Sequence, residues 1–313
     1  MVYLPLAGAV FLGWALGAND TSNVFGTAVA TRMLKFRYAA LLAAGFIIAG
    51  ALLQGGAGID TLAGISGSGV QTAFISSLAA AITVTIMTIM RLPISTSQAV
   101  VGAIIGIGIM NGAVNTSGLK KIVICWIATP IGGIIFAIIV YNIIMFVLRF
   151  VRPTIFNVDS FIKAGLVVAG CYGAYALGAN NVANVAGVFA GGIITPFQAL
   201  LIGSFSIALG VLTYSRRVMA TVGTSIVKLD SLSALVVVVA HSITVHIFAV
   251  IGVPVSSSQA VIGAVIGIGF IKGVQTVNLY SLLRVFTGWI FTPALACAVS
   301  VLIFLITRIR VIL

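Results

Sequence analysis

Two copies of a polar motif in otherwise apolar sequence contain residue types that bind cations. The motif GANDTSN begins at Gly17, and a related motif, GANNVAN, begins at Gly178. Glycine and several polar residues in an apolar run predict an interrupted helix, which leaves backbone carbonyl groups free. Amide, carboxylate and carbonyl oxygens are the ligands that a hard cation such as Na+ prefers. The candidate cation ligands are Asn19, Asp20, Asn23, Asn180, Asn181 and Asn184.

Asp20 is the strongest candidate of this set, because it is the one carboxylate in its apolar segment. A charge in such a segment is costly and is usually retained for function. The alternative is that the Asn and Asp side chains hold helices together by hydrogen bonds. The pair Asn19 and Asn23 recurs as Asn180 and Asn184, which favours the cation site.

A second pair of motifs, PISTSQA and PVSSSQA, begins at Pro93 and Pro254. Proline followed by hydroxyl side chains and then by an unbroken apolar run predicts the start of a helix. Hydroxyl groups and the free N–H groups of a first helical turn can donate hydrogen bonds to a tetrahedral oxyanion. Two ordinary capped helices are the alternative, and the duplication argues against it. The candidate anion ligands are Ser95, Thr96, Ser97, Gln98, Ser256, Ser257, Ser258 and Gln259.

The composition places these motifs in a membrane protein. Of the 313 residues, 61% are hydrophobic and 6% are charged, and the mean hydropathy is +1.28. Soluble domains carry about 25% charged residues, so a soluble protein and a nucleic-acid-binding domain are excluded. The net charge of +12 is interpreted as a signal for orientation in the membrane. Three cysteines without CxxC or Cys/His spacing argue against a disulfide framework or a zinc site.

About ten apolar segments approach the roughly 20 residues that a transmembrane helix needs. The first contains Asn19 and Asp20 and lacks a basic start, so it is not expected to be a cleaved signal peptide. Some segments are expected to be broken or re-entrant. The segments lie near residues 3–30, 37–54, 70–90, 93–111, 119–148, 161–190, 197–214, 233–251, 254–271 and 281–307.

The chain contains an internal duplication. Each motif pair matches at seven of eleven positions when the chain is shifted by 161 residues, and WIATP at 126 matches WIFTP at 289 at a shift of 163 residues. The expected domains are a first transmembrane repeat over 1–148, a short linker over 149–162 and a second transmembrane repeat over 163–313.

The charges of equivalent loops indicate how the two halves are oriented. The loop after the first segment is basic, whereas its counterpart near 191–196 has no basic residue. The loop near 55–69 has no basic residue, whereas its counterpart holds Arg216, Arg217 and Lys228. Basic loops favour the cytoplasmic side, and an odd number of segments per half reverses the second half. The sequence therefore predicts two inverted-topology repeats with both termini outside.

Three further features are assigned less specific roles. The glycines that follow the serine motifs, such as Gly102 and Gly263, are expected to pack helices closely. His241 and His246 have no counterparts in the first half and are expected to form hydrogen bonds between packed helices, with a proton relay as the alternative. Arg91, beside the first serine motif, is interpreted either as a loop charge or as an attractant for the anion.

Together, the four motifs resemble the signature of the inorganic phosphate transporter (PiT) family. That signature combines a GANDxxN element with a downstream P-[IV]-S-[ST]-[ST] element in each half. The chain has GANDTSN at 17, GANNVAN at 178, PISTS at 93 and PVSSS at 254, so the resemblance covers nearly its whole length. It implies secondary transport of inorganic phosphate coupled to Na+ or H+. By position, the serine motifs would hold phosphate and the asparagine motifs the cation.

Two positions depart from the family pattern. Asn181 stands where the family usually has an aspartate, so one of two expected carboxylates is absent. Gln98 and Gln259 stand where many members have histidine or threonine, and we expect them to orient the anion ligands. Related permeases that carry sulfate share this architecture, so sulfate stays open as the substrate.

The sequence therefore predicts an all-α polytopic membrane protein that imports phosphate with a cation, Na+ being favoured over H+, by alternating access. No enzymatic activity, cofactor or nucleic-acid partner is expected. A sulfate symporter of the same fold is the first alternative, and an anion channel that uses the same helix starts is the second. A serine hydrolase is disfavoured, because the histidines are not duplicated. The expected location is a plasma membrane, with a prokaryotic inner membrane favoured, and a homo-oligomer stays open.

Overall fold

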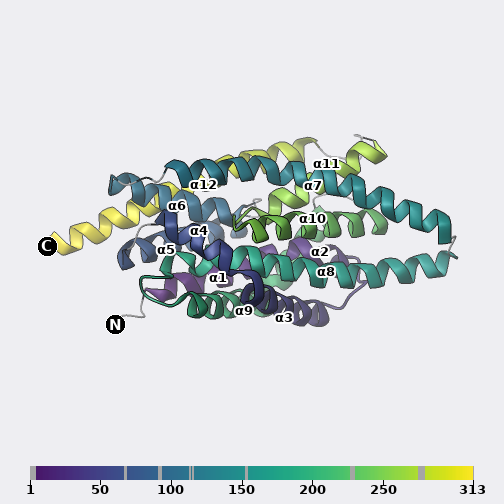
Figure 1. The fold of residues 1–313 in the computed structure, drawn as a ribbon, viewed down its shortest axis with the longest axis horizontal. Coiled ribbons are helices and arrows are strands. Elements are labelled where there is room, and N and C mark those ends of the chain that lie inside the picture. The colour runs from purple at the N-terminus through teal and green to yellow at the C-terminus, as the bar shows by residue number, and fades with distance from the viewer. Residues whose placement is uncertain are drawn as a thin grey trace.

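The computed structural model describes residues 5–66, 69–90, 94–112, 114, 116–151, 154–225, 230–273 and 279–312. Within these ranges the chain forms twelve α-helices, most of which lie along one long axis (Figure 1). A short 3₁₀ helix, η1 (Gly187–Phe189), lies between α8 and α9. The helices are α1 (Leu6–Asp20), α2 (Ser22–Ala30), α3 (Phe36–Gln54), α4 (Gly56–Ser66), α5 (Val70–Ile89), α6 (Thr96–Met110), α7 (Thr116–Val151), α8 (Ile155–Ala186), α9 (Pro196–Ser225), α10 (Ser231–Ile251), α11 (Ser257–Lys272) and α12 (Leu279–Ile312).

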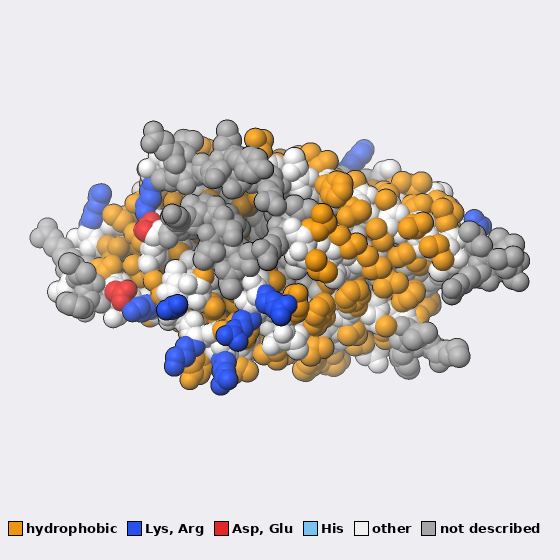
Figure 2. Space-filling view, turned by 180° about the vertical axis from the view of Figure 1, so that it is seen from behind, with side chains coloured by type: hydrophobic (Ala, Val, Ile, Leu, Met, Phe, Trp, Pro, Cys, Tyr) orange, Lys and Arg blue, Asp and Glu red, His pale blue; other side chains and the backbone are white. Residues whose placement is uncertain are grey.

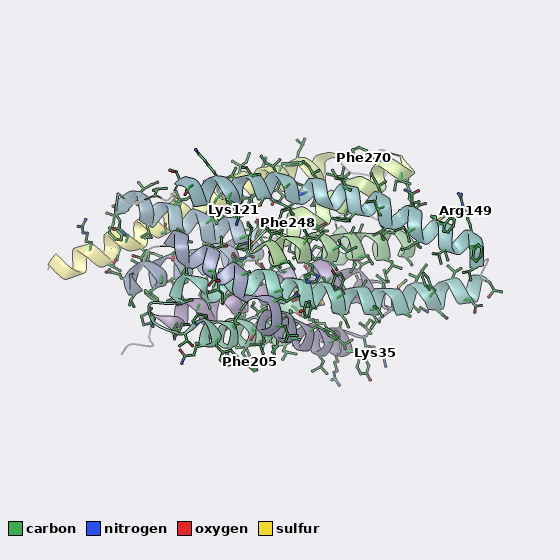
Figure 3. All side chains as sticks on the ribbon, in the orientation of Figure 1. Lys35, Lys121, Arg149, Phe205, Phe248 and Phe270 are labelled. Carbon is green, nitrogen blue, oxygen red and sulfur yellow. The ribbon has the colours of Figure 1, made fainter. Side chains whose placement is uncertain are left out.

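Seven helices of the described ranges are long and apolar enough to cross a membrane, namely α3, α5, α7, α8, α9, α10 and α12. The outer face of α7 carries large apolar side chains that are exposed at every fourth residue. Figure 3 shows Phe205 and Phe270 on opposite outer sides of the bundle, and both are more than half exposed. Exposed apolar surface of this extent needs lipid around it, so the protein is a polytopic membrane protein. The α7 stripe is Ile127, Ile131, Ile135, Ile139 and Ile143.

Two of the expected membrane segments form shorter helices. The segments predicted near 93–111 and 254–271 are α6, with 15 residues, and α11, with 16 residues. Seven helices, rather than ten, therefore meet the length and hydropathy that a full span needs in the described part of the chain. The expectation of about ten segments stays a prediction.

The first asparagine motif interrupts its helix, as predicted. Helix α1 ends at Asp20 and α2 begins at Ser22, although Thr21 between them keeps helical angles of φ −62° and ψ −22°. The Thr21 hydroxyl donates to the Gly17 carbonyl and the Ser22 hydroxyl to the Asn19 carbonyl, each at 2.7 Å. Such back-bonding competes with the helical hydrogen bonds and bends helices.

The second asparagine motif does not interrupt its helix. Helix α8 continues from Ile155 to Ala186 through the whole motif. The positions that match Thr21 and Ser22 hold Val182 and Ala183, which have no hydroxyl group for back-bonding. The interruption is therefore confined to the first copy.

The two halves of the sequence are packed into one another. Helix α1 packs on α9 and α3 packs on α8, while α6 packs on α12 and α7 packs on α11. Every one of these pairings joins the first half to the second and has a counterpart when the halves are exchanged. Figure 1 shows α7 ending at the right of the bundle, where α8 begins, and α12 ending at the left. The main hydrophobic core accordingly contains residues of both halves, for example Leu12, Ala80 and Leu177.

Glycines allow the close approaches between the halves. A Cβ added to Gly17 would lie 2.0 Å from the Ile207 carbonyl oxygen, and one added to Gly178 would lie 2.0 Å from that of Ile47. The glycines after the serine motifs behave in the same way: Gly102 and Gly263 lie against the backbones of Pro293 and Pro130, which belong to the matching WIFTP and WIATP segments. The predicted packing role of these glycines is confirmed.

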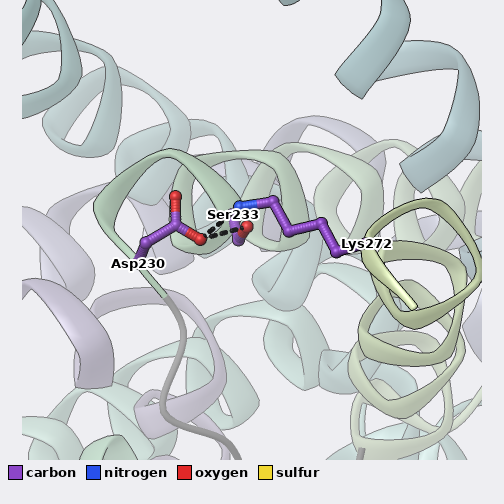
Figure 4. Close-up of polar contacts among 3 residues, drawn as sticks. All are labelled: Asp230, Ser233 and Lys272. Carbon is purple, nitrogen blue, oxygen red and sulfur yellow. Dashed lines mark hydrogen bonds and ion pairs between the residues drawn. The ribbon is translucent and has the colours of Figure 1, made fainter. Parts of the chain in front are cut away.

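A charged contact joins the start of α10 to the end of α11 (Figure 4). Asp230 Oδ1 accepts hydrogen bonds from Lys272 Nζ at 2.5 Å and from Ser233 Oγ at 2.6 Å. Partial burial acts to raise the pKa of Asp230, but the hydrogen bonds from Lys272 and Ser233 outweigh it and hold the pKa below its usual value. The Asp230 side chain is 54% exposed, so this pair contributes little to stability at neutral pH.

Candidate functional site

Both serine motifs begin a helix, as predicted. Helix α6 begins at Thr96, where Ser95 Oγ accepts a hydrogen bond from the Gln98 backbone N–H at 3.3 Å. Helix α11 begins at Ser257, where Ser256 Oγ accepts the same bond from Gln259 at 3.3 Å. The N–H groups of the two residues before each glutamine, Thr96 and Ser97 in α6 and Ser257 and Ser258 in α11, have no acceptor within the helix and can bind an anion. Pro93 and Arg91 lie outside the described residues.

The eight candidate anion ligands are enclosed in the protein. All are buried except Ser258, which is partly exposed and lies 2.9 Å from the Ser256 hydroxyl oxygen. Water is therefore excluded from most of both helix starts. Hydrogen-bond donors in such surroundings act more strongly on an anion than they do in water.

Asn180 fixes the backbone that leads into α11. Its Oδ1 accepts from the Val255 N–H at 2.9 Å and its Nδ2 donates to the Val255 carbonyl at 2.9 Å. The Asn180 side chain thus forms hydrogen bonds with both the backbone N–H and the backbone carbonyl of Val255, the residue just before Ser256. The second asparagine motif in this way positions the second serine motif.

Each asparagine motif also reaches the serine motif of the opposite half. Asn184 Nδ2 donates to Ser97 Oγ at 2.9 Å, and Asn23 Nδ2 donates to Ser257 Oγ at 3.0 Å. Ser97 Oγ in turn donates to the Val255 carbonyl at 2.8 Å. Asn180, Asn181, Asn184, Ser97 and Val255 thus form one network of hydrogen bonds that joins candidate cation and anion ligands, whereas Asn23 and Ser257 form a separate pair.

Asp20 brings the only buried carboxylate into this network. The other three acidic residues of the chain are exposed, whereas Asp20 is 4% exposed. Asp20 Oδ2 accepts a hydrogen bond from Asn181 Nδ2 at 3.4 Å, and Thr96 lies beside it. Asn181 Oδ1 accepts hydrogen bonds from both Asn180 and Asn184. Asn181, which stands where the family pattern has an aspartate, therefore links the asparagines of the second motif to one another.

Several buried polar atoms in and beside the network have no hydrogen-bond partner among the described residues. Buried polar atoms are normally hydrogen bonded, so these unpartnered atoms are candidates for contact with a ligand. The four oxygens among them are suited to a cation or to a ligand that donates a proton. These atoms are Thr96 Oγ1, Gln98 Oε1, Asn184 Oδ1, Gln259 Oε1 and His241 Nδ1; Trp126 Nε1 and Trp289 Nε1 are also unpartnered.

One candidate cation ligand uses its amide N–H outside the four motifs. Asn19 Nδ2 donates to Thr88 Oγ1 of α5 at 3.0 Å and makes no side-chain bond to the other asparagine residues in the described structure. Its matching residue, Asn180, binds the backbone of Val255 instead. The two copies of the motif therefore use their first asparagine differently.

His241 belongs to the site, although the sequence indicated no role for it there. Its Nε2 lies 2.8 Å from Ser257 Oγ, and the side chain is fully buried. The first-half counterpart is Ala80, so the duplication that pointed to the other residues could not point to His241. His246 lies elsewhere, between Tyr172 and Gln54, and forms the interhelical hydrogen bonds expected for it.

Proteins of similar sequence are transporters from archaea and bacteria. A protein of Methanocaldococcus jannaschii named "putative phosphate permease" is 28% identical over 303 residues, which cover 96% of each chain. A sulfate permease of Bacillus subtilis is 28% identical over 302 residues, covering 94% of this chain and 85% of that protein.

The fold matches a solved structure. A structure described as "The sodium-dependent phosphate transporter" superposes with a TM-score of 0.86 over 98% of this chain and 99% of that chain, at 24% identity. The family described as "Phosphate transporter family" matches over residues 16–156 and 151–300, which take in both asparagine motifs and both serine motifs. The chain therefore belongs to the phosphate transporter family.

Proposed function

We propose that the protein imports inorganic phosphate in symport with a cation, Na+ being favoured over H+, by alternating access. The observation that carries the proposal is the pair of hydrogen bonds between the halves, in which Asn184 donates to Ser97 and Asn23 donates to Ser257. A cation and an anion bound at the two ends of these contacts would stabilise one another at low dielectric. Membership of the family and the name of the similar solved structure support the same substrate and cation.

Phosphate would bind between the starts of α6 and α11. Hydroxyl and N–H groups there would donate hydrogen bonds, Ser97 through its backbone N–H because its hydroxyl proton goes to the Val255 carbonyl. No fixed positive charge would hinder release of the anion. Gln98 and Gln259 would orient these donors from the first turn of each helix. The proposed anion ligands are Ser95, Thr96, Ser97, Gln98, Ser256, Ser257, Ser258 and Gln259.

The cation would bind near Asp20, which supplies the charge. The side-chain oxygens of Asn184 and Thr96 have no hydrogen-bond partner in the described part of the chain and are the neutral ligands best placed to complete the coordination of the cation. The side-chain oxygens of Asn180 and Asn181 already accept hydrogen bonds. Asn19 and Asn23 would contribute from the interrupted helix. Because this site has a single carboxylate, we expect it to bind less total cation charge than a site with two carboxylates would.

The architecture we propose for transport is a pair of inverted-topology repeats in a plasma membrane. Two observations support it. Each helix pairing between the halves that is described above has a counterpart when the halves are exchanged, and the equivalent helices α7 and α12 run in opposite directions. Figure 2 shows Lys and Arg side chains gathered toward one end of the molecule, and Figure 3 places Lys35 and Arg149 toward the end where α7 meets α8. That end would face the cytoplasm, which leaves both termini outside.

The proposal is tested by uptake of radiolabelled phosphate into proteoliposomes. An inward Na+ gradient and an inward proton gradient are imposed separately, with liposomes lacking protein as the control. We expect phosphate to accumulate above its equilibrium level under the Na+ gradient. Equilibration without accumulation under either gradient would contradict symport and favour an anion channel.

Sulfate transport is the second candidate, because the sulfate permease of Bacillus subtilis is as similar in sequence as the archaeal relative. Hydroxyl and N–H donors alone do not distinguish two tetrahedral oxyanions. Excess unlabelled sulfate is therefore added as a competitor in the same assay. We expect phosphate uptake to persist, whereas its loss would identify a sulfate symporter of the same fold.

A further inference from the structure

His241 shares a serine hydroxyl with a residue of the asparagine motif. Ser257 Oγ lies 2.8 Å from His241 Nε2 and 3.0 Å from Asn23 Nδ2. The three side chains come from α10, α11 and α2, and His241 and Ser257 are both buried. One oxygen atom at the start of α11 thus meets two nitrogen atoms.

The direction of the His241 hydrogen bond decides where the hydroxyl proton of Ser257 points. A serine hydroxyl has one hydrogen to donate and two lone pairs to accept with. The Asn23 amide N–H occupies one lone pair. If His241 Nε2 carries a hydrogen, it occupies the other, and the Ser257 proton is left for a ligand. If Nε2 carries no hydrogen, Ser257 donates its proton to His241, and that proton is no longer available for a hydrogen bond to the anion.

The other ring nitrogen distinguishes the two arrangements. His241 Nδ1 is buried and has no hydrogen-bond partner among the described residues. A hydrogen on Nδ1 would therefore be a buried N–H group without an acceptor, and such groups are rarer in proteins than acceptors with an unused lone pair. The arrangement with the hydrogen on Nε2 leaves only a bare lone pair at Nδ1 and is the less costly one.

We infer that His241 is a positioning residue of the anion site, which donates from Nε2 to Ser257 and so directs the Ser257 hydroxyl proton to the transported oxyanion. The inference rests on the proposed transport function. Ser97, on the other motif helix, cannot act in this way, because its proton is already donated to the Val255 carbonyl. The first-half positions that match Ser257 and His241 are Thr96 and Ala80, so the matching hydroxyl has no histidine as its equivalent partner.

Transport kinetics test the inference through matched variants. His241→Met fills the space but cannot donate, and we expect it to raise KM for phosphate about tenfold, the effect of losing one hydrogen bond to an anion. We expect little change in the Na+ concentration for half-maximal uptake. His241→Gln supplies an amide N–H near the position of Nε2 and should restore most of the affinity. His246→Met, outside the site, is the control.

A double-mutant cycle with Ser257→Ala separates positioning from packing. If His241 acts through the Ser257 hydroxyl, His241→Met adds no further rise in KM on the Ser257→Ala background. An unchanged KM in His241→Met, or an equal rise on both backgrounds, would overturn the inference. Wild-type protein that fails to accumulate phosphate would instead contradict the proposed function.

The ring hydrogen can also be located without transport. The chain has two histidines, so His246→Gln leaves one, and ¹⁵N NMR of labelled protein in detergent then reports on His241 alone. We expect the hydrogen on Nε2 and a bare Nδ1. A bare Nε2 with a hydrogen on Nδ1 would overturn the inference even if the His241→Met variant did not fold.

Discussion

Asn184 Nδ2 lies 2.9 Å from Ser97 Oγ, so a residue of the second half holds a hydroxyl of the first half, 87 positions earlier in the chain. Asn184 also donates to Asn181, which in turn donates to Asp20. A path of hydrogen bonds therefore leads from the Asp20 carboxylate through Asn181 and Asn184 to Ser97 at the start of α6. Binding of a cation at one end and an anion at the other would act on the same hydrogen bonds, and such a coupling is reciprocal.

Removing the Asn184 to Ser97 contact should weaken both ligands together. We expect Ser97→Ala to raise KM for phosphate and the half-maximal Na+ concentration, each by about tenfold, because one hydrogen bond contributes about 1 kcal/mol and the buried partner is left unsatisfied. In a double-mutant cycle with Asn184→Ala, a coupling energy of about 1 kcal/mol is expected. Ser76→Ala is the control, because the Ser76 hydroxyl is buried but bonds only within its own helix. Additive effects of Ser97→Ala and Asn184→Ala would contradict the path.

Neutralising Asp20 should remove the cation dependence of transport. Asp20→Asn keeps the size of the side chain and removes the only buried negative charge, so we expect Na+-driven accumulation of phosphate to be lost while the protein still folds. Asp60→Asn, at an exposed carboxylate, should behave like the wild type. Uptake is measured in proteoliposomes, and folding is checked by size-exclusion chromatography. Wild-type Na+ dependence in Asp20→Asn would remove Asp20 from the cation site.

The helix starts could be predicted from sequence because their causes are local. Ser95 and Ser256 cap α6 and α11 through backbone groups three residues away, and that chemistry is contained in the motif itself. The interruption at Thr21 is local in the same sense, since it follows from hydroxyl groups that bond to the preceding turn.

The contacts between the motifs could not be predicted, because they depend on how the halves pack. Spacing within each half indicates neither that Asn184 reaches Ser97 nor that Asn19 turns to Thr88. The contact of His241 with the second serine motif could not be predicted for another reason. His241 occurs in one half only, whereas the strongest signal in the sequence was the duplication.

Close packing at Gly17 should be intolerant of a methyl group. A Cβ there would lie 2.0 Å from the Ile207 carbonyl oxygen, so α1 and α9 would have to separate. We expect Gly17→Ala to lower the free energy of unfolding by about 1–3 kcal/mol, the usual effect of overpacking. Gly45→Ala is the matched control, because nothing lies within 4 Å of the added Cβ and alanine favours the helix. Thermal unfolding in detergent measures both. Equal stability of the two variants would contradict the close approach.

The contact between Asp230 and Lys272 should give stability a small dependence on acidic pH. The hydrogen bonds from Lys272 and Ser233 lower the pKa of Asp230 below its usual 3.8 in the folded protein, so the unfolded chain binds the proton more readily. The stabilisation is therefore fully present above about pH 4 and is lost as the pH falls through the lowered pKa. The pair is partly exposed, which limits its contribution to at most about 1 kcal/mol.

Thermal midpoints of wild type and Asp230→Asn, measured across this pH range, test that prediction. The two proteins should differ above about pH 4 and converge below it, because the wild-type carboxylate is then protonated and no longer attracts Lys272. Asp159→Asn is the control, since it removes an exposed pair with Lys163 within one helix and should change the midpoint less. A difference between wild type and Asp230→Asn that stays constant down to the lowest pH would show that the carboxylate acts through packing or helix capping, and not through its charge.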